Sequence, residues 1–220
     1  MKKRIVFALA GLFLLNSCIV KSLQPFYTQQ AVSFDSRLIG KWTSYNGKTW
    51  EIKSTKELMN KEREEDSIIS IEDEFLYKHY KDAYFIEYTS NEKYASFIGV
   101  PFKIDNQLFI DFMPVEYNQK NANSLASKHL IETHSLTKVD RQANGTFKLS
   151  WFDEDRMQHL FDEQKIRLKH ERPSIDKSKF VLTETSENLM KFLKKYMSSE
   201  IQEKWKTDTH YTLTKVDARP

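Results

Sequence analysis

One aspartate and two histidines in the middle of the chain have side chains that can transfer protons. Asp111 lies in an alternating run in which Phe109 and Met113 share its face. If that strand is covered on both sides, the carboxylate is partly buried and must find a partner or take up a proton. With His134 or His129 it can form an acid/base pair, as a hydrolase requires. A structural hydrogen bond to a neighbouring loop is the simpler interpretation.

Six histidines invite a search for a metal site. The closest pair, His129 and His134, has an odd separation, which places the two rings on opposite faces of a strand. Zinc needs convergent ligands, and the sequence has neither a His-Glu-x-x-His motif nor a second cysteine. It also lacks a Gly-x-Ser-x-Gly elbow, a phosphate-binding glycine loop and a dinucleotide fingerprint. We therefore expect no metal and no cofactor.

The single cysteine, Cys18, follows a pattern typical of export signals. Three basic residues are followed by an apolar run over residues 5–15 and by Ser17. The apolar run is too short to cross a bilayer as a helix, which takes about 20 residues. The pattern predicts that residues 1–17 are a cleaved signal peptide.

The four residues Leu15-Asn16-Ser17-Cys18 resemble the lipobox of bacterial lipoproteins. This resemblance implies that Cys18 is the site of lipid attachment and the first residue of a membrane-tethered protein. Residues 18–35 lack clear periodicity, so we expect a lipidated tether there. Ile19 and Val20 follow without an acidic cluster, which favours a cell-envelope protein on the outer membrane, facing the periplasm.

Removal of the signal changes the charge of the protein. The full chain has 34 basic and 31 acidic residues, and the signal contains three of the basic ones and no acids. The mature charge is therefore close to zero, which argues against nucleic acid as a partner. Aromatic residues make up 13% of the chain, which argues against disorder. We expect a single domain over residues 36–220.

Alternating apolar residues from Leu38 to Phe152 are typical of half-buried strands. Asn46-Gly47 favours a hairpin, and a two-residue turn there would put Trp42 and Trp50 on opposite faces. The acid-rich run 62–66 indicates a solvated loop, and the polar stretch 114–128 indicates a long loop or lid. Further strands are expected over residues 67–71, 75–80, 84–88, 94–102, 107–113, 130–139 and 146–152.

Two helices are expected after the sheet, over residues 153–163 and 186–198. Asp153 and Ser186 can cap them, and apolar residues follow at helical spacing in both. Short strands are expected over 166–169 and 179–183. The fold class is therefore mainly β (β+α), an antiparallel barrel or strongly curved sheet with two late helices. The pentapeptide at 136–140 recurs at 213–217, but five residues are too few to indicate a duplication.

Gly40-Lys41-Trp42 resembles the first strand of lipocalins, whose Gly-x-Trp closes one end of an eight-stranded barrel. A broader resemblance, to uncharacterised lipoproteins chiefly of the Bacteroidota, is carried by residues 23–28, 38–42, 47–50, 108–114 and 129–134. It implies an exported lipoprotein with a β-rich, lipocalin-like domain. The resemblance brings no activity with it.

Three hypotheses on function follow. The first is a non-enzymatic binding or accessory protein of the envelope that holds an apolar molecule inside the barrel, among inward aromatic residues such as Tyr84, Tyr88 and Phe97. The second is a structural or interaction protein of the envelope that uses segments 53–66 and 114–128. The third is a hydrolase based on Asp111 and a histidine. We rank it last because no nucleophile motif accompanies the pair, and so expect no enzyme.

Overall fold

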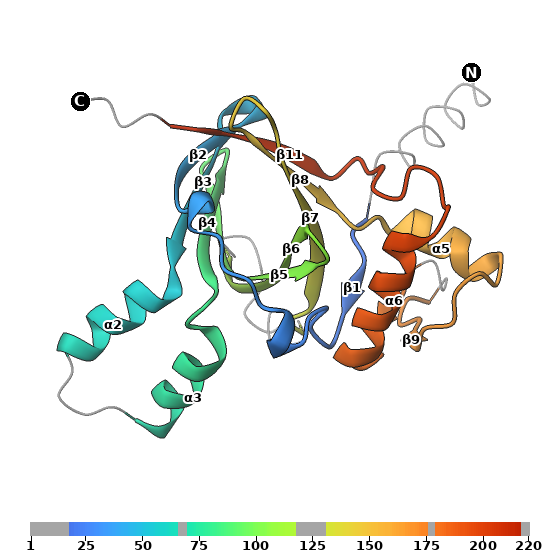
Figure 1. Cartoon of the computed structure of the whole chain (residues 1–220), viewed down its shortest axis with the longest axis horizontal. Helices are drawn as coiled ribbons and strands as arrows, with labels where there is room; N and C mark the ends of the chain where they lie inside the picture. Colours follow the sequence, from blue (N-terminus) through green and yellow to red (C-terminus); the bar gives the residue numbers. More distant parts are fainter. Residues whose placement is uncertain (1–17, 66–69, 118–130, 176–178, 217–220) are drawn as a thin grey trace, which may run out of the picture.

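The structure is a computed structural model that describes residues 18–65, 70–117, 131–175 and 179–216. Its centre is a closed antiparallel barrel of eight strands (Figure 1). The strands are β2 (Gly40–Ser44), β3 (Lys48–Ser54), β4 (Tyr84–Ser90), β5 (Lys93–Ile104), β6 (Gln107–Tyr117), β7 (His134–Arg141), β8 (Phe147–Trp151) and β11 (His210–Lys215). They follow one another around the barrel in this order, and pairing of β11 with β2 closes the ring. The expected mainly β fold and its antiparallel barrel are confirmed.

Three short strands extend the sheet beside β7. They are β1 (Lys21–Ser22), β9 (His170–Glu171) and β10 (Val181–Leu182). β1 pairs with β7 and β10, so two residues of the segment expected as a lipidated tether take part in the sheet. Val20 and Phe26 from this segment are fully buried against the outer wall of the barrel. The sequence pattern missed this because the segment is held by pairing with distant strands, not by a periodicity of its own.

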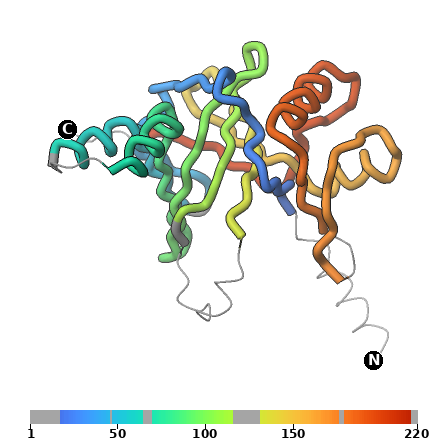
Figure 2. The backbone as a smooth tube through the Cα atoms, turned by 90° about the horizontal axis from the view of Figure 1, so that it is seen from below, coloured from blue at the N-terminus to red at the C-terminus, as the bar shows by residue number. Residues whose placement is uncertain are grey.

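Two helices cover one side of the barrel, as Figures 1 and 2 show. Helix α5 (Glu154–Asp162) begins after Asp153, whose carboxylate accepts from the backbone N–H of Arg156 at 2.9 Å. Helix α6 (Ser186–Ser198) has the expected bounds, but Thr185 and not Ser186 is its N-cap. Both helices are confirmed. They do not follow the sheet, however, since β11 comes after them and completes the barrel.

Two further helices project from the opposite side of the barrel (Figures 1 and 2). They are α2 (Thr55–Glu65) and α3 (Ile71–Tyr80). The expected solvated loop at 62–66 and strand at 75–80 are therefore wrong over the described residues. Ser70 and Asp73 form a reciprocal capping box, and acidic residues occupy the first turn of α3, both of which stabilise a helix N-terminus. Residues 67–69 of the other expected strand lie outside the described residues.

The first hairpin has a three-residue turn over Tyr45–Gly47, one of three single-turn helices that also cover Gln29–Ala31 and Ser36–Leu38. Gly47 supplies the positive φ, 68°, that the turn requires. The odd loop length places Trp42 directly opposite Trp50, so both rings face the barrel interior. The expectation of opposite faces, which assumed a two-residue turn, was wrong. Trp42 donates from Nε1 to the carbonyl of Leu38, just before β2, at 2.8 Å.

Alternation along the strands produces two cores. One fills the barrel and includes Trp42, Ile86 and Ile110. The other lies between the outer wall and the segments packed on it, with Phe102 from the wall and Leu193 from α6. Among the described residues, no helix has the length and apolar character needed to cross a membrane.

Gly99 provides a test of the packing inside the barrel. A Cβ atom at this position would come within 2.6 Å of Ile86 Cδ1 and 3.1 Å of Ile110 Cγ2. We expect Gly99→Ala to lower the free energy of unfolding by about 1–3 kcal/mol through overpacking, measured by urea denaturation. Ile86→Val removes the closest atom. The double variant should therefore lose less free energy of unfolding than the sum of the losses in the two single variants. Strict additivity would contradict this packing.

Candidate functional site

Asp111 and His134 meet on the outer wall of the barrel. Alternation places the Asp111 side chain of β6 on the same face as Phe109, and His134 begins the neighbouring strand β7. Asp111 Oδ1 lies 2.6 Å from His134 Nδ1. The other oxygen, Oδ2, accepts from the backbone N–H of Phe26 at 2.8 Å. The structure thus joins both partners that the sequence proposed for Asp111, a histidine and a neighbouring loop.

The pair is deeply covered. Asp111 is 1% exposed, and the His134 side chain is 15% exposed. Burial raises the pKa of both Tyr27 and Tyr80, and the negative charge of Asp111 adds to the shift in each. These phenols therefore stay neutral at physiological pH in the neighbourhood of the carboxylate. A carboxylate in such surroundings is stabilised by its hydrogen bonds, so Asp111 holds the N-terminal segment against the barrel.

An Asp–His contact through Nδ1 is also the arrangement that orients a catalytic imidazole toward a nucleophile. Ser22 lies directly across from His134 in the sheet, but it is fully buried and its hydroxyl accepts from Gln24 N–H at 3.2 Å. No described serine, threonine or cysteine donates to the His134 ring. Within the described chain, the pair therefore lacks an aligned nucleophile.

The other histidines are scattered. His129 lies outside the described residues, while His170 and His210 each bind a nearby carbonyl through Nδ1. Across the described ranges, no group of three histidine, cysteine, aspartate or glutamate side chains could hold a metal ion.

Cys18 stands where the described chain begins and is already fixed to the domain. Its carbonyl accepts from Glu154 N–H at 2.9 Å, at the start of α5. Burial, followed by the Glu154 carboxylate, raises the pKa of the Cys18 thiol. The thiol is half-buried and protonated at neutral pH, which makes it a weak nucleophile in this environment.

Aromatic side chains fill the barrel. Trp50 contacts three other rings, with centroids 4.6 Å away for Tyr88, 5.1 Å for Tyr211 and 6.3 Å for Trp151. Such edge and tilted contacts stabilise a packed core. The interior retains one buried hydroxyl, Thr137 Oγ1, without a partner in the described structure.

Two cavities of the described structure matter for binding: the smaller is lined in part by Leu108, Val139 and Phe147 of the barrel core, and the larger lies outside the barrel. The smaller, of about 300 Å³, is bordered by Arg37, Lys103 and Asp140. The larger, of about 560 Å³, lies between α6 and residues 164–168. Sequence reasoning missed the larger cavity, although Lys191, Phe192 and Lys195 form a mixed stripe at helical spacing that marks one of its walls.

No family model, curated protein or solved structure matches this chain.

Replacing Asp111 should loosen the N-terminal segment. We expect Asp111→Ala to lower the free energy of unfolding by about 2–4 kcal/mol, because it leaves the buried Phe26 N–H without an acceptor. Asp111→Asn should cost less, since its amide oxygen can still accept that bond. Urea denaturation measures the stability, and hydrogen exchange at the Phe26 amide reports the local loss.

The exposed Asp208→Ala serves as the control and should leave both measurements unchanged. Equal stability of Asp111→Ala and Asp111→Asn, with the Phe26 amide protected in both, would contradict the role of Asp111 in holding the N-terminal segment against the barrel.

Proposed function

We propose that this protein is a bacterial envelope lipoprotein, anchored through acylated Cys18, that works as a non-enzymatic binding or accessory protein. The export pattern before Cys18 and its position at the domain surface support the anchor. Glu154 N–H holds the Cys18 carbonyl, so acyl chains on this residue would leave directly from the domain. The placement on the outer membrane, facing the periplasm, belongs to the same proposal.

The observation that carries the binding role is the 560 Å³ cavity beside α6. Its volume lies in the range of small-molecule sites, and the buried Asp111–His134 pair is not part of its wall. The barrel interior, by contrast, is occupied by rings in mutual contact. We therefore assign the ligand to the cavity beside α6, and not to the barrel interior where the sequence led us to expect it.

A lipocalin relationship remains part of the proposal. It is supported by the eight-stranded antiparallel barrel and by Trp42, which is buried in the first barrel strand and donates to the Leu38 carbonyl. Against the expected pattern, α5 and α6 lie before the last strand of the barrel. This insertion is also what forms the walls of the cavity.

A second candidate, an interaction protein of the envelope, is favoured by the exposed apolar side chains of α3. Ile71 is 92% and Phe75 58% exposed, although large apolar groups usually avoid water. A photo-crosslinker at position 75 should capture a specific envelope protein in cells, whereas one at Lys93 should not. Capture at neither position would argue against this role.

Acylation of Cys18 gives the direct test of anchoring. In bacteria fed an alkyne fatty acid, the natural chain should carry the label and fractionate with membranes. Cys18→Ala should abolish the label, because it removes the only thiol in the chain. Label that persists in Cys18→Ala, or a natural chain that is never labelled, would refute the anchor.

A further inference from the structure

The large cavity has two walls of different origin. Helix α6 contributes a stripe at helical spacing, and the chain that follows α5 contributes the opposite wall over residues 164–168. The α6 stripe consists of Asn188, Lys191, Phe192, Lys195, Tyr196 and Ser199. It adjoins the stripe of Leu189 and Leu193, which faces the outer core. The stripe is therefore held in place by a buried helix face.

Cations dominate the rim of this cavity. Lys165, Arg167, Lys191 and Lys195 border it, against one carboxylate, Glu184. Lys165 is paired with Glu163 at 3.0 Å, but none of the other three cations forms an ion pair within the described part of the chain. Three unpaired cations thus face one opening in a chain whose formal net charge is only +3.

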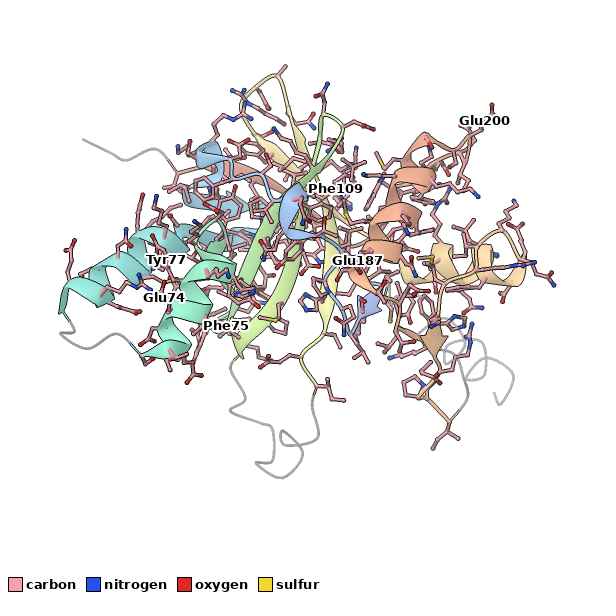
Figure 3. All side chains as sticks on the ribbon, turned by 60° about the horizontal axis from the view of Figure 1, so that its bottom comes forward. Glu74, Phe75, Tyr77, Phe109, Glu187 and Glu200 are labelled. Carbon is pink, nitrogen blue, oxygen red and sulfur yellow. The ribbon has the colours of Figure 1, made fainter. Side chains whose placement is uncertain are left out.

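The one acidic side chain is already engaged. Glu184 accepts from Asn188 Nδ2 at 2.9 Å, and from the backbone N–H groups of Thr185 and Lys169. The Asn188 hydrogen bond lowers the pKa of the Glu184 carboxyl, so it is ionised at neutral pH. Its charge is satisfied by these donors, which leaves the cations available. Figure 3 shows Glu187 and Glu200, two acids of this region, near opposite ends of α6.

The floor of the cavity is apolar. Ile166, Leu168 and Ile201 line it in half-buried positions. Phe192 stacks on Tyr196 with ring centroids 5.6 Å apart. The Tyr196 hydroxyl is directed away to the Lys204 carbonyl at 2.9 Å, so the ring presents carbon to the cavity. An alkyl chain laid on this floor would remove apolar surface from water.

We propose that this cavity binds a single-chain amphiphile with an anionic headgroup. Arg167, Lys191 and Lys195 receive the head, and the apolar floor receives the chain. This inference deepens the proposed binding role and rests on it. An uncharged apolar ligand would leave the three cations unused, whereas an acidic peptide would leave the floor without a partner.

The test uses the full chain in nanodiscs of phosphatidylcholine, which has no net charge. Two photoreactive probes with alkyl chains of similar length, a dodecanoate and a dodecyltrimethylammonium, are crosslinked and mapped by peptide mass spectrometry. The dodecanoate should label peptides that contain residues 164–168 and 191–201. Arg167→Gln/Lys191→Gln/Lys195→Gln should reduce this labelling about tenfold, because three charge contacts are lost.

The control Lys56→Gln/Lys61→Gln/Lys93→Gln removes three exposed charges elsewhere and should label like the natural chain. Equal labelling of the cavity variant, or equal labelling by the cationic probe, overturns the anionic ligand. Displacement of the probe by a polyglutamate peptide but not by dodecanoate also overturns it, in favour of an acidic peptide. Labelling confined to barrel strands would overturn this site but would still support a binding role for the protein. Anchoring is tested separately, by fatty-acid labelling of Cys18.

Discussion

Closure of the barrel by β11 is the constraint on which the rest of the structure depends. Seven consecutive strands leave β2 and β8 as open edges, and an open edge exposes unpaired backbone groups. β11 pairs with both edges, although residues 152–209 separate it from β8. The segment 152–209 must therefore begin and end at the same part of the barrel wall. Trp151 N–H donates to the Thr209 carbonyl at 3.0 Å, which joins its two ends. This return places α5 and α6 against the barrel and creates the outer core.

Because the barrel wall is covered on both sides, a polar side chain in it loses its contact with water, which costs free energy unless the side chain is hydrogen-bonded. Asp111 lies in that wall, and its two oxygens are used by His134 and by the Phe26 N–H. The carboxylate thereby fixes the N-terminal segment to the barrel, which completes the cover of the outer core. An arrangement that resembles the start of a catalytic triad is thus accounted for by the needs of the fold.

Local patterns in the sequence carried the prediction where side chains alternate strongly. The strands around Ile86, Ile110 and Leu149, the two late helices and the partners of Asp111 were predicted on this basis. β11 was not, because Leu213 is its only buried residue and gives no periodicity. The repeated pentapeptide shows the limit of local reasoning, since Leu136 faces the outer core and Leu213 the barrel interior. The large cavity also escaped prediction, because α6 and residues 164–168 meet only in the folded chain.

Helix α5 links the proposed anchor to the proposed binding cavity. It begins at Glu154, which holds the Cys18 carbonyl, and its nine residues end just before the wall that starts at Gln164. A helix of that length is about 14 Å long, which is less than the thickness of a bilayer core. With Cys18 acylated, the cationic rim would stand close to the membrane surface, where single-chain amphiphiles partition. The inserted helices would then do two things at once: they bring β11 back to close the barrel, and they place a charged cavity beside the anchor.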